Sequence, residues 1–309
     1  MTKTTQSRPQ FLASSAIGAM AAGGAGALLP KQTSATSKLP GSSPLAARGN
    51  KLSVAGYSYR SLLNIDDPKL TMEEFFDDCA AMGVEGVEPT SYYFAEDVSI
   101  ADMRNTKAEA FRRGLDISGT AIRCDFCFPV GSKRAQEVAH VKRWIELADA
   151  MDAPTIRIFS GGIKSDQSEE EAYQLAVDGI NECCEYAGKY GVILGLENHG
   201  GLSATAENLL QFRADVPSPW FGINLDTGNF HSADVYGDLA KVAPHACNVQ
   251  FKVSIQQEGE SKQPADMERI AKILADAGYP GYVVLEFEEP GDPREHCPKL
   301  IEQMRAAFQ

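Results

Sequence analysis

From residue 51 to the end of the chain, short apolar runs alternate with longer stretches in which apolar residues recur every three or four positions. Short apolar runs are typical of buried strands, and the longer spacing is typical of amphipathic helices. Strands are predicted at 52–59, 84–88, 116–122, 154–160, 191–197, 221–226, 247–253 and 281–287. Helices are predicted at 71–82, 100–114, 133–151, 168–190, 203–214, 234–243, 264–277 and 292–308.

Eight strands that each precede a helix predict an α/β protein with a parallel sheet. Signals at the helix ends agree with this pattern: Thr71 is followed by Glu74 in a capping box, and Gly83 follows the same helix. Eight such pairs within residues 51–309, without a Pro/Gly-rich linker, have the size and rhythm of a single (β/α)8 TIM barrel. The alternative, a doubly wound open sheet, requires a glycine-rich turn after the first strand, and none follows Tyr59.

Residues 1–50 are predicted to be an export signal peptide with a linker, and 51–309 to be the barrel domain. A short basic start precedes an uncharged, Ala- and Gly-rich segment at 11–30, which is the order found in signal peptides. The hexapeptide SRPQFL at 7–12 resembles the twin-arginine export motif, with Pro9 in place of the second arginine. We therefore expect an exported, periplasmic protein without stable membrane contact after signal cleavage. An uncleaved membrane anchor is the alternative.

Composition and charge narrow the class of protein. With 43% hydrophobic and 23% charged residues, the chain can form a sizeable core, which excludes disordered, collagen-like and polytopic membrane proteins. Residues 1–50 carry five basic groups and no acid, which leaves 24 basic and 42 acidic groups, a net charge of −18, in 51–309. This charge repels phosphate backbones, so we expect neither nucleic acid nor anionic membrane surfaces as partners.

The seven cysteines are an odd number spread over predicted helices and strands, so most are expected to be buried thiols rather than disulfides. The spacing of Cys124 and Cys127 could serve redox or zinc chemistry, but no second such pair follows. The cysteines therefore do not indicate a cofactor.

The carboxyl ends of the strands form the catalytic face of a TIM barrel, so polar residues there are candidates for chemistry. The last four predicted strands each place a polar side chain at this end: Glu197, Asp226, Gln250 and Glu286. Side chains alternate along a strand, so we expect these four to point inward and converge. Three adjacent carboxylates require a shared proton or a cation, and oxygen donors favour Mn²⁺ or Mg²⁺ over Zn²⁺ or Co²⁺. The alternative is that each acid caps a helix or pairs with a nearby base.

The motifs GLENHGG, INLDTGN, NVQFK and VVLEFE occur in an order that resembles the xylose isomerase-like barrel superfamily of sugar phosphate isomerases and epimerases. The resemblance covers almost the whole predicted barrel. It implies one divalent metal ion bound by Glu197, Asp226, Gln250 and Glu286. Gln250 stands where the family has a histidine, and Asn229 stands where a histidine often follows the aspartate. An amide oxygen is a weaker ligand than an imidazole nitrogen, so the preference shifts toward harder ions.

The resemblance further implies that a proton is removed next to a carbonyl and that the metal stabilises the resulting enediolate. Glu197 and Glu286 are the predicted proton-transfer pair. Proton transfer at one carbon gives epimerisation, and transfer between neighbouring carbons gives isomerisation. A leaving group one carbon further on gives β-elimination from a 3-keto-glycoside, which is the reaction of a lyase or hydratase.

Two other classes of function stay open at this point. The first is a non-catalytic sugar-binding protein that has lost its metal, which the residues Gln250 and Asn229 suggest. The second is a DNA-repair endonuclease on the same fold, which the charge of −18 and the scarcity of histidines disfavour. The expected partner is a small-molecule sugar or keto-sugar, and the chain could form a homo-oligomer.

Further residues are predicted to contact the substrate. His199 lies two residues after Glu197 and resembles a substrate-contacting histidine of the family, and Lys252 shares the inward face of its strand. Glu88 and Arg157 interrupt apolar strands, where burial without a partner is unfavourable, so a position facing the site is expected. Asn229 is the fifth residue predicted to contact the substrate. The alternatives are that His199 is an ordinary loop residue, that Lys252 is solvated, and that Arg157 only neutralises the acids.

Two weaker signals concern the surroundings of the site. The aromatic run at 92–94 could form a wall for a sugar, or could pack under its loop. The remaining histidines are expected at the surface of helices or loops: His140, His231, His245 and His296.

Overall fold

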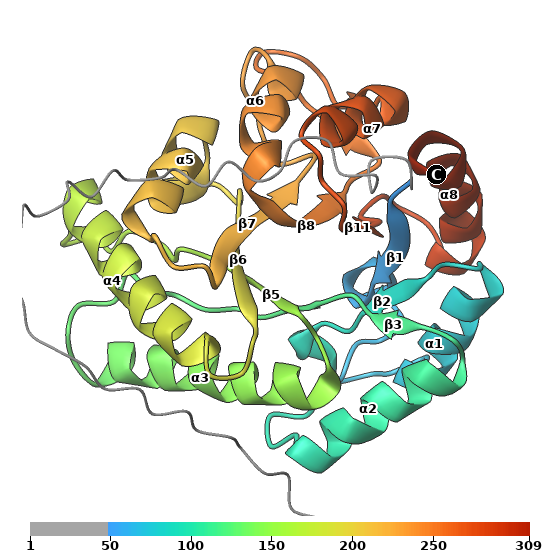
Figure 1. The fold of residues 1–309 in the computed structure, drawn as a ribbon, viewed down its shortest axis with the longest axis horizontal. Helices are drawn as coiled ribbons and strands as arrows, with labels where there is room; N and C mark the ends of the chain where they lie inside the picture. The colour runs from blue at the N-terminus through green and yellow to red at the C-terminus, as the bar shows by residue number, and fades with distance from the viewer. Residues whose placement is uncertain (1–48) are drawn as a thin grey trace, which may run out of the picture. The chain divides into compact units, whose positions relative to one another are not determined.

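Parallel strands form a barrel at the centre of the fold, and helices surround it (Figure 1). The computed structural model describes residues 49–309. The predicted export signal falls outside the described residues, so it stays a prediction, as does the domain boundary at residue 50. Within residues 49–309, no helix is both long enough and apolar enough to span a membrane.

The strands follow one another around the barrel in the order β3-β2-β1-β11-β8-β7-β6-β5-β4, with parallel pairing throughout. Their bounds are β1 (Lys51–Ala55), β2 (Gly86–Glu88), β3 (Asp116–Ile117), β4 (Thr120–Ala121), β5 (Thr155–Ile158), β6 (Ile193–Glu197), β7 (Phe221–Asp226), β8 (Ala246–Phe251) and β11 (Tyr282–Leu285). The first strand pairs with the last, since β1 pairs with β11 as well as with β2. This closure confirms the TIM barrel and excludes the open doubly wound sheet. A separate antiparallel pair, β9 (Ser254–Ile255) and β10 (Gln263–Pro264), lies in the segment after β8.

The third barrel strand, predicted as continuous over 116–122, is divided into β3 and β4. β3 pairs with β2 and β4 pairs with β5, so the two short pieces together close the barrel between their neighbours. The interruption includes Gly119, where the packing is close. A Cβ atom at Gly119 would lie 2.6 Å from Thr155 Oγ1 and 3.2 Å from Glu88 Oε1, so a larger residue there would force these neighbours to move.

Eight helices cover the outside of the barrel: α1 (Met72–Ala81), α2 (Ile100–Arg112), α3 (Ser132–Met151), α4 (Glu169–Ala187), α5 (Ala206–Asp215), α6 (Val235–Val242), α7 (Met267–Asp276) and α8 (Pro293–Phe308). The predicted capping box is present: Thr71 Oγ1 accepts from the Glu74 amide, and the Glu74 side chain accepts from the Thr71 amide. Apolar side chains fill the layer between helices and strands, and six of the seven cysteines are buried thiols there.

The end of the first predicted strand differs from the expectation. Residues Gly56–Tyr59 form a 3-10 turn rather than extended strand. This turn brings the Ser58 hydroxyl next to the end of β11, where it donates to Leu285 O at 2.9 Å and accepts from Phe287 N at 2.8 Å. The hydroxyl therefore joins the first and last strands at the catalytic face.

The close packing around Gly119 predicts that a larger residue at this position destabilises the protein. Gly119→Ala is expected to lower the free energy of unfolding by about 1 to 3 kcal/mol, because an added methyl group in a filled interior forces neighbours to move. The double variant Gly119→Ala/Thr155→Ala is expected to recover part of this loss, since it removes the nearer obstacle. Urea denaturation of the three proteins tests this, and a single variant as stable as the wild type contradicts it.

Candidate functional site

The four residues predicted to bind a metal ion lie together at the carboxyl ends of adjacent strands. Glu197 and Asp226 are the last residues of β6 and β7, Gln250 is the last but one of β8, and Glu286 directly follows β11. All four side chains are buried, with exposed fractions of 5% or less. The parallel register pairs Asp226 with Gln250 on neighbouring strands.

Glu197 lies between a cation and an amide. Arg157 Nε, from β5, is 2.8 Å from Glu197 Oε2, and Asn229 Nδ2 donates to Oε1 at 3.0 Å. The Arg157 Nε–H makes no directed hydrogen bond to the carboxylate, so this contact is an ion pair. Arg157 is fixed by a hydrogen bond to Ile122 O at 2.8 Å and by the ring of Phe159, 4.1 Å from its guanidinium carbon. Arg157 therefore pairs with Glu197, and its predicted contact with the substrate stays a prediction.

Lys252 places its ammonium group among the other carboxylates. Its Nζ lies 3.3 Å from Asp226 Oδ2, 3.5 Å from Glu286 Oε2 and 2.6 Å from Glu288 Oε2, and it donates to Asn229 Oδ1 at 3.1 Å. Burial alone would lower the pKa of Lys252, but the carboxylates outweigh it and raise that pKa. The lysine is thus firmly charged and lies where the acidic side chains converge.

Asp226 has one carboxylate oxygen with a hydrogen-bond donor and one that is paired only with the Lys252 ammonium, 3.3 Å away. Its Oδ1 accepts from Gly228 N at 2.8 Å, whereas Oδ2 is buried and accepts no hydrogen bond from the residues that the structure describes. The backbone of Asp226 is clamped by the Asn198 side chain, which donates to its carbonyl and accepts from its amide, both at 2.9 Å. A buried oxygen in a fixed position without a hydrogen bond is a group for which an ion or a proton is expected.

Gln250 belongs to a layer of hydrogen-bonded side chains below the carboxylates. Its Oε1 accepts from Asn224 Nδ2 at 2.8 Å, and its Nε2 donates to Glu88 Oε2 at 2.9 Å. Asn248 Nδ2 bridges the same layer by donating to Glu88 Oε1 and Asn224 Oδ1, both at 2.9 Å. The amide of Gln250 is therefore engaged at both ends, and its metal-binding role stays a prediction. Glu88 lies in this layer and is not among the residues that line the cavity above it.

Burial dominates the acid–base properties of the site. Loss of water raises the pKa of Glu88 to about 7 and that of Glu197 to about 8, although hydrogen bonds and nearby cations oppose the shift. Burial also raises the pKa of Asp226 and of Glu286, against the effect of Lys252. Four buried carboxyl groups thus face the buried Arg157 and the partly buried Lys252, and full ionisation of these six groups would leave two excess negative charges. The partly exposed Glu288 adds a further carboxylate beside Lys252.

The donor set fits a hard divalent ion in chemistry and in charge. Oxygen atoms of Glu197, Asp226 and Glu286 are the ligand type that Mg²⁺ and Mn²⁺ prefer, and Asp226 Oδ2 accepts no hydrogen bond from the described residues. Two positive charges would balance the excess charge of the four buried carboxylates. In residues 49–309, however, no three acidic, histidine or cysteine side chains are spaced to hold an ion as they stand. The ammonium of Lys252 lies between Asp226 and Glu286, so this side chain has to withdraw before an ion can enter.

A cavity of about 610 Å³ opens above these groups, a volume that suits a small-molecule ligand. Glu197, Glu286, Lys252, Arg157 and His199 are all on its wall. Two of the predicted metal ligands and three of the predicted substrate contacts therefore share one space. The other predicted site residues are not among those that line it: Glu88, Asp226, Asn229 and Gln250.

His199 lies at the rim of this cavity. Its side chain is exposed, and its ring packs against Phe159 with 4.4 Å between ring centroids. The pKa of His199 is lowered by partial loss of water and by the positive charges of Arg157 and Lys252. The ring is thus mainly neutral at pH 7 and can both donate and accept a hydrogen bond.

Several residues on the cavity wall were not predicted from the sequence. Glu288 follows Glu286 by two positions, so strand alternation could have identified it. Tyr57 reaches the wall only because of the unpredicted turn after β1, and Arg123 carries no local signal. Tyr92, from the predicted aromatic run, lines the cavity, and its hydroxyl lies 3.3 Å from the Arg157 guanidinium.

The chain matches the family described as xylose isomerase-like TIM barrel over residues 76–307, and it therefore belongs to that family. A D-psicose 3-epimerase from Clostridium cellulolyticum H10, solved with D-tagatose, has a TM-score of 0.71 at 16% identity, covering 84% of this chain and 99% of the other. A 3-keto-D-glucoside 4-epimerase from E. coli has a TM-score of 0.67 at 14% identity, covering 83% and 99%. A probable 3-DHS dehydratase from Bacillus anthracis has a TM-score of 0.61 at 17% identity, covering 83% and 97%. A search of curated proteins finds no match. At these identities the likeness establishes a shared fold.

The buried carboxyl groups predict how stability depends on pH. Acids whose pKa is higher in the folded than in the unfolded protein hold extra protons when folded, so they favour the folded state below their unfolded pKa. This advantage is lost between about pH 4.5 and the folded values, about 7 for Glu88 and about 8 for Glu197. His199 and His245, whose pKa values are lowered, oppose the trend but are outnumbered.

Metal-free protein is therefore expected to lose stability from pH 5.5 to 8.5, at about 1.4 kcal/mol for each unit of pKa shift. Calorimetric unfolding in the presence of EDTA measures this, and addition of Mn²⁺ is expected to flatten the dependence. A melting temperature that stays constant or rises over this range contradicts the assignment of raised pKa values.

Proposed function

We propose that this protein is a sugar isomerase or epimerase that moves a proton next to a carbonyl group. The observation that carries the proposal is the pair Glu197 and Glu286, two buried carboxyl groups with raised pKa on the wall of one cavity. A carboxyl group whose pKa lies near the working pH can both remove and return a proton. Two of the similar solved structures are sugar epimerases, and a third is a probable dehydratase.

Glu197 is the better positioned of the two to remain fixed during the reaction. Asn229 holds one of its oxygens and Arg157 lies beside the other, so the carboxyl group keeps its orientation whether or not it carries the proton. Glu286 has looser contacts, with Lys252 at 3.5 Å and no amide donor comparable to Asn229 among the described residues. We assign proton removal to one of the two and proton return to the other.

A divalent metal ion is part of this proposal. Glu197, Asp226 and Glu286 would hold it, with Gln250 behind them in the amide layer. When bound, such an ion polarises the carbonyl and stabilises the negative charge that develops on the enediolate. Side chains of the protein bind the substrate. Lys252, displaced from the carboxylates, contacts a substrate oxygen, and His199 binds a hydroxyl group at the rim of the cavity. Tyr57, Tyr92 and Phe159 provide aromatic walls on which a sugar ring can pack.

Export to the periplasm is also a proposal, and it rests on the sequence of residues 1–50 alone.

Removal of either proton-transfer group tests the central claim. Glu197→Gln and Glu286→Gln are each expected to reduce deuterium uptake from heavy water into a reactive keto-sugar by roughly 10²- to 10⁴-fold, because the amide cannot exchange the proton. Glu295→Gln, an exposed acid on α8, is the matched control and is expected to react as the wild type does. Sugar binding without deuterium uptake in the wild type would instead favour the non-catalytic sugar-binding class.

The contacts of Lys252 predict its effect on metal binding. Lys252→Met removes a positive charge that lies 3.3 Å from Asp226 and 3.5 Å from Glu286, so Mn²⁺ affinity is expected to rise at least tenfold. Lys252→Arg keeps the charge and serves as the control. Titration calorimetry with Mn²⁺ measures both, and unchanged or weaker binding by Lys252→Met would show that the ammonium does not compete with the ion.

A further inference from the structure

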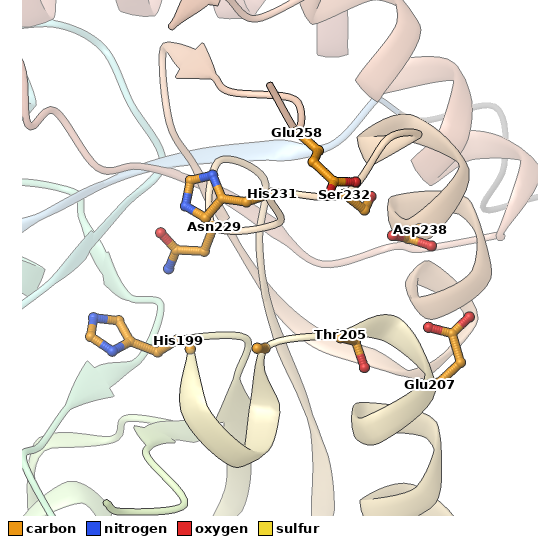
Figure 2. Close-up of a pocket in the computed structure, with 10 residues that line it drawn as sticks. His199, Thr205, Glu207, Asn229, His231, Ser232, Asp238 and Glu258 are labelled. Atoms are coloured by element: carbon orange, nitrogen blue, oxygen red, sulfur yellow. The ribbon is translucent and has the colours of Figure 1, made fainter. Parts of the chain in front are cut away.

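A second cavity, of about 540 Å³, adjoins the catalytic one. Figure 2 shows the residues that line the second cavity. It is formed by the segments that follow β6, β7 and β8 together with the first turns of α5 and α6. Its polar wall comes from Thr205, Glu207, His231, Ser232, Asp238 and Glu258. None of these residues takes part in the proton transfer described above.

The two cavities share a wall. His199 and Gly200 line both of them. Asn229 lines the second cavity, and its side chain donates to Glu197 Oε1 at 3.0 Å. In Figure 2, His199 and Asn229 lie at the side of the cavity opposite Glu207 and Asp238. In the second cavity, a bound group would therefore be separated from the Glu197 carboxyl group by the side chain of Asn229.

The size of the catalytic cavity makes a second cavity unnecessary for a free monosaccharide. Its 610 Å³ already lies within the range of about 300 to 1,000 Å³ that whole small-molecule sites occupy. An adjoining polar space of similar size suits a substrate with two parts, one that reacts and one that only binds.

The polar groups of the second cavity suit sugar hydroxyls. Glu207 and Asp238 pair with Lys241, whose Nζ lies 3.0 Å and 2.8 Å from their carboxylates, and both carboxylates can also accept from a ligand hydroxyl. The hydroxyl oxygen of Ser232 is buried and finds no partner within residues 49–309. A sugar hydroxyl both donates and accepts, so it can satisfy this hydroxyl and the carboxylates together.

The charge of the second cavity opposes a phosphate group. Glu207, Asp238 and Glu258 line it, while none of its described lining residues is Lys or Arg. Lys241 pairs with two of these carboxylates from outside the wall, so a phosphoryl group in the cavity would meet three carboxylates and no lining cation. The acidic lining thus favours the binding of neutral glycosides over that of sugar phosphates.

We propose that the second cavity binds the non-reacting part of an unphosphorylated glycoside, so that the substrate is a keto-glycoside with a second ring rather than a free sugar or a sugar phosphate. This inference rests on the proposed function for its reacting part. It concerns the substrate, and it holds for epimerisation and for β-elimination alike.

Binding measurements test the subsite separately from the chemistry. In the Glu286→Gln background, titration calorimetry compares 3-keto-cellobiose with methyl 3-keto-D-glucoside, which lacks the second ring. The disaccharide is expected to bind at least tenfold more tightly, and fructose 6-phosphate more weakly than either. Equal affinity for the two keto-glycosides, or tighter binding of the phosphate, overturns the inference whether or not the wild type catalyses exchange.

Two variants locate the effect in the second cavity. Ala204→Trp fills it, and His231→Ala removes a polar group from its wall; each is expected to weaken disaccharide binding at least fivefold and to leave the methyl glycoside within twofold. His140→Ala, an exposed histidine on α3, is the matched control and should change neither. An equal effect on both ligands would place the second ring elsewhere. Absence of deuterium uptake by the wild type from every keto-sugar, with the binding difference intact, would refute the proposed function and leave the subsite standing.

Discussion

The site depends on the balance between four buried carboxyl groups and the two cations that reach them. Arg157 is rigidly held and always charged, so it favours the ionised form of Glu197, whereas burial raises the pKa of that carboxyl group to about 8. Lys252 is the adjustable partner, because a lysine side chain is long and its ammonium contacts three carboxylates without a forked geometry. The remaining charge has to be balanced by protons or by an ion, which makes the site responsive to both.

The amide layer below the carboxylates explains the glutamine at position 250. A primary amide donates and accepts at the same time, and Gln250 uses both capacities to join Asn224 to Glu88. Glu88 in turn accepts from two amides, which keeps a carboxyl group with a pKa near 7 in the interior of the barrel. Gln250, which stands in place of the histidine expected from the resemblance, is therefore part of a hydrogen-bonded network that spans the barrel from β2 to β8.

The local pattern of the sequence was sufficient for the barrel and for the order of its strands, but not for every strand end: the first strand stops at Ala55. Strand β7 was predicted with its observed bounds, and alternation placed Asp226 on the inner face. The close contact between Gly119 and Thr155 was not predictable, because it depends on the position of a neighbouring strand. The position of the Lys252 ammonium, and the second cavity behind His199, likewise depend on contacts between segments far apart in sequence. Periodicity identifies the face on which a side chain lies, but the partner of that side chain is a property of the assembled fold.

The pairing of β1 with β11 has a consequence for the order in which the molecule is made. The edge of β1 that pairs with β11 has no partner strand until residues 282–285 have been synthesised. Every shorter nascent chain carries an open parallel edge, and parallel contacts between distant segments form slowly. The barrel can therefore close only after nearly the entire polypeptide has left the ribosome. Until then, chaperones can bind the unpaired edge of the unfinished chain.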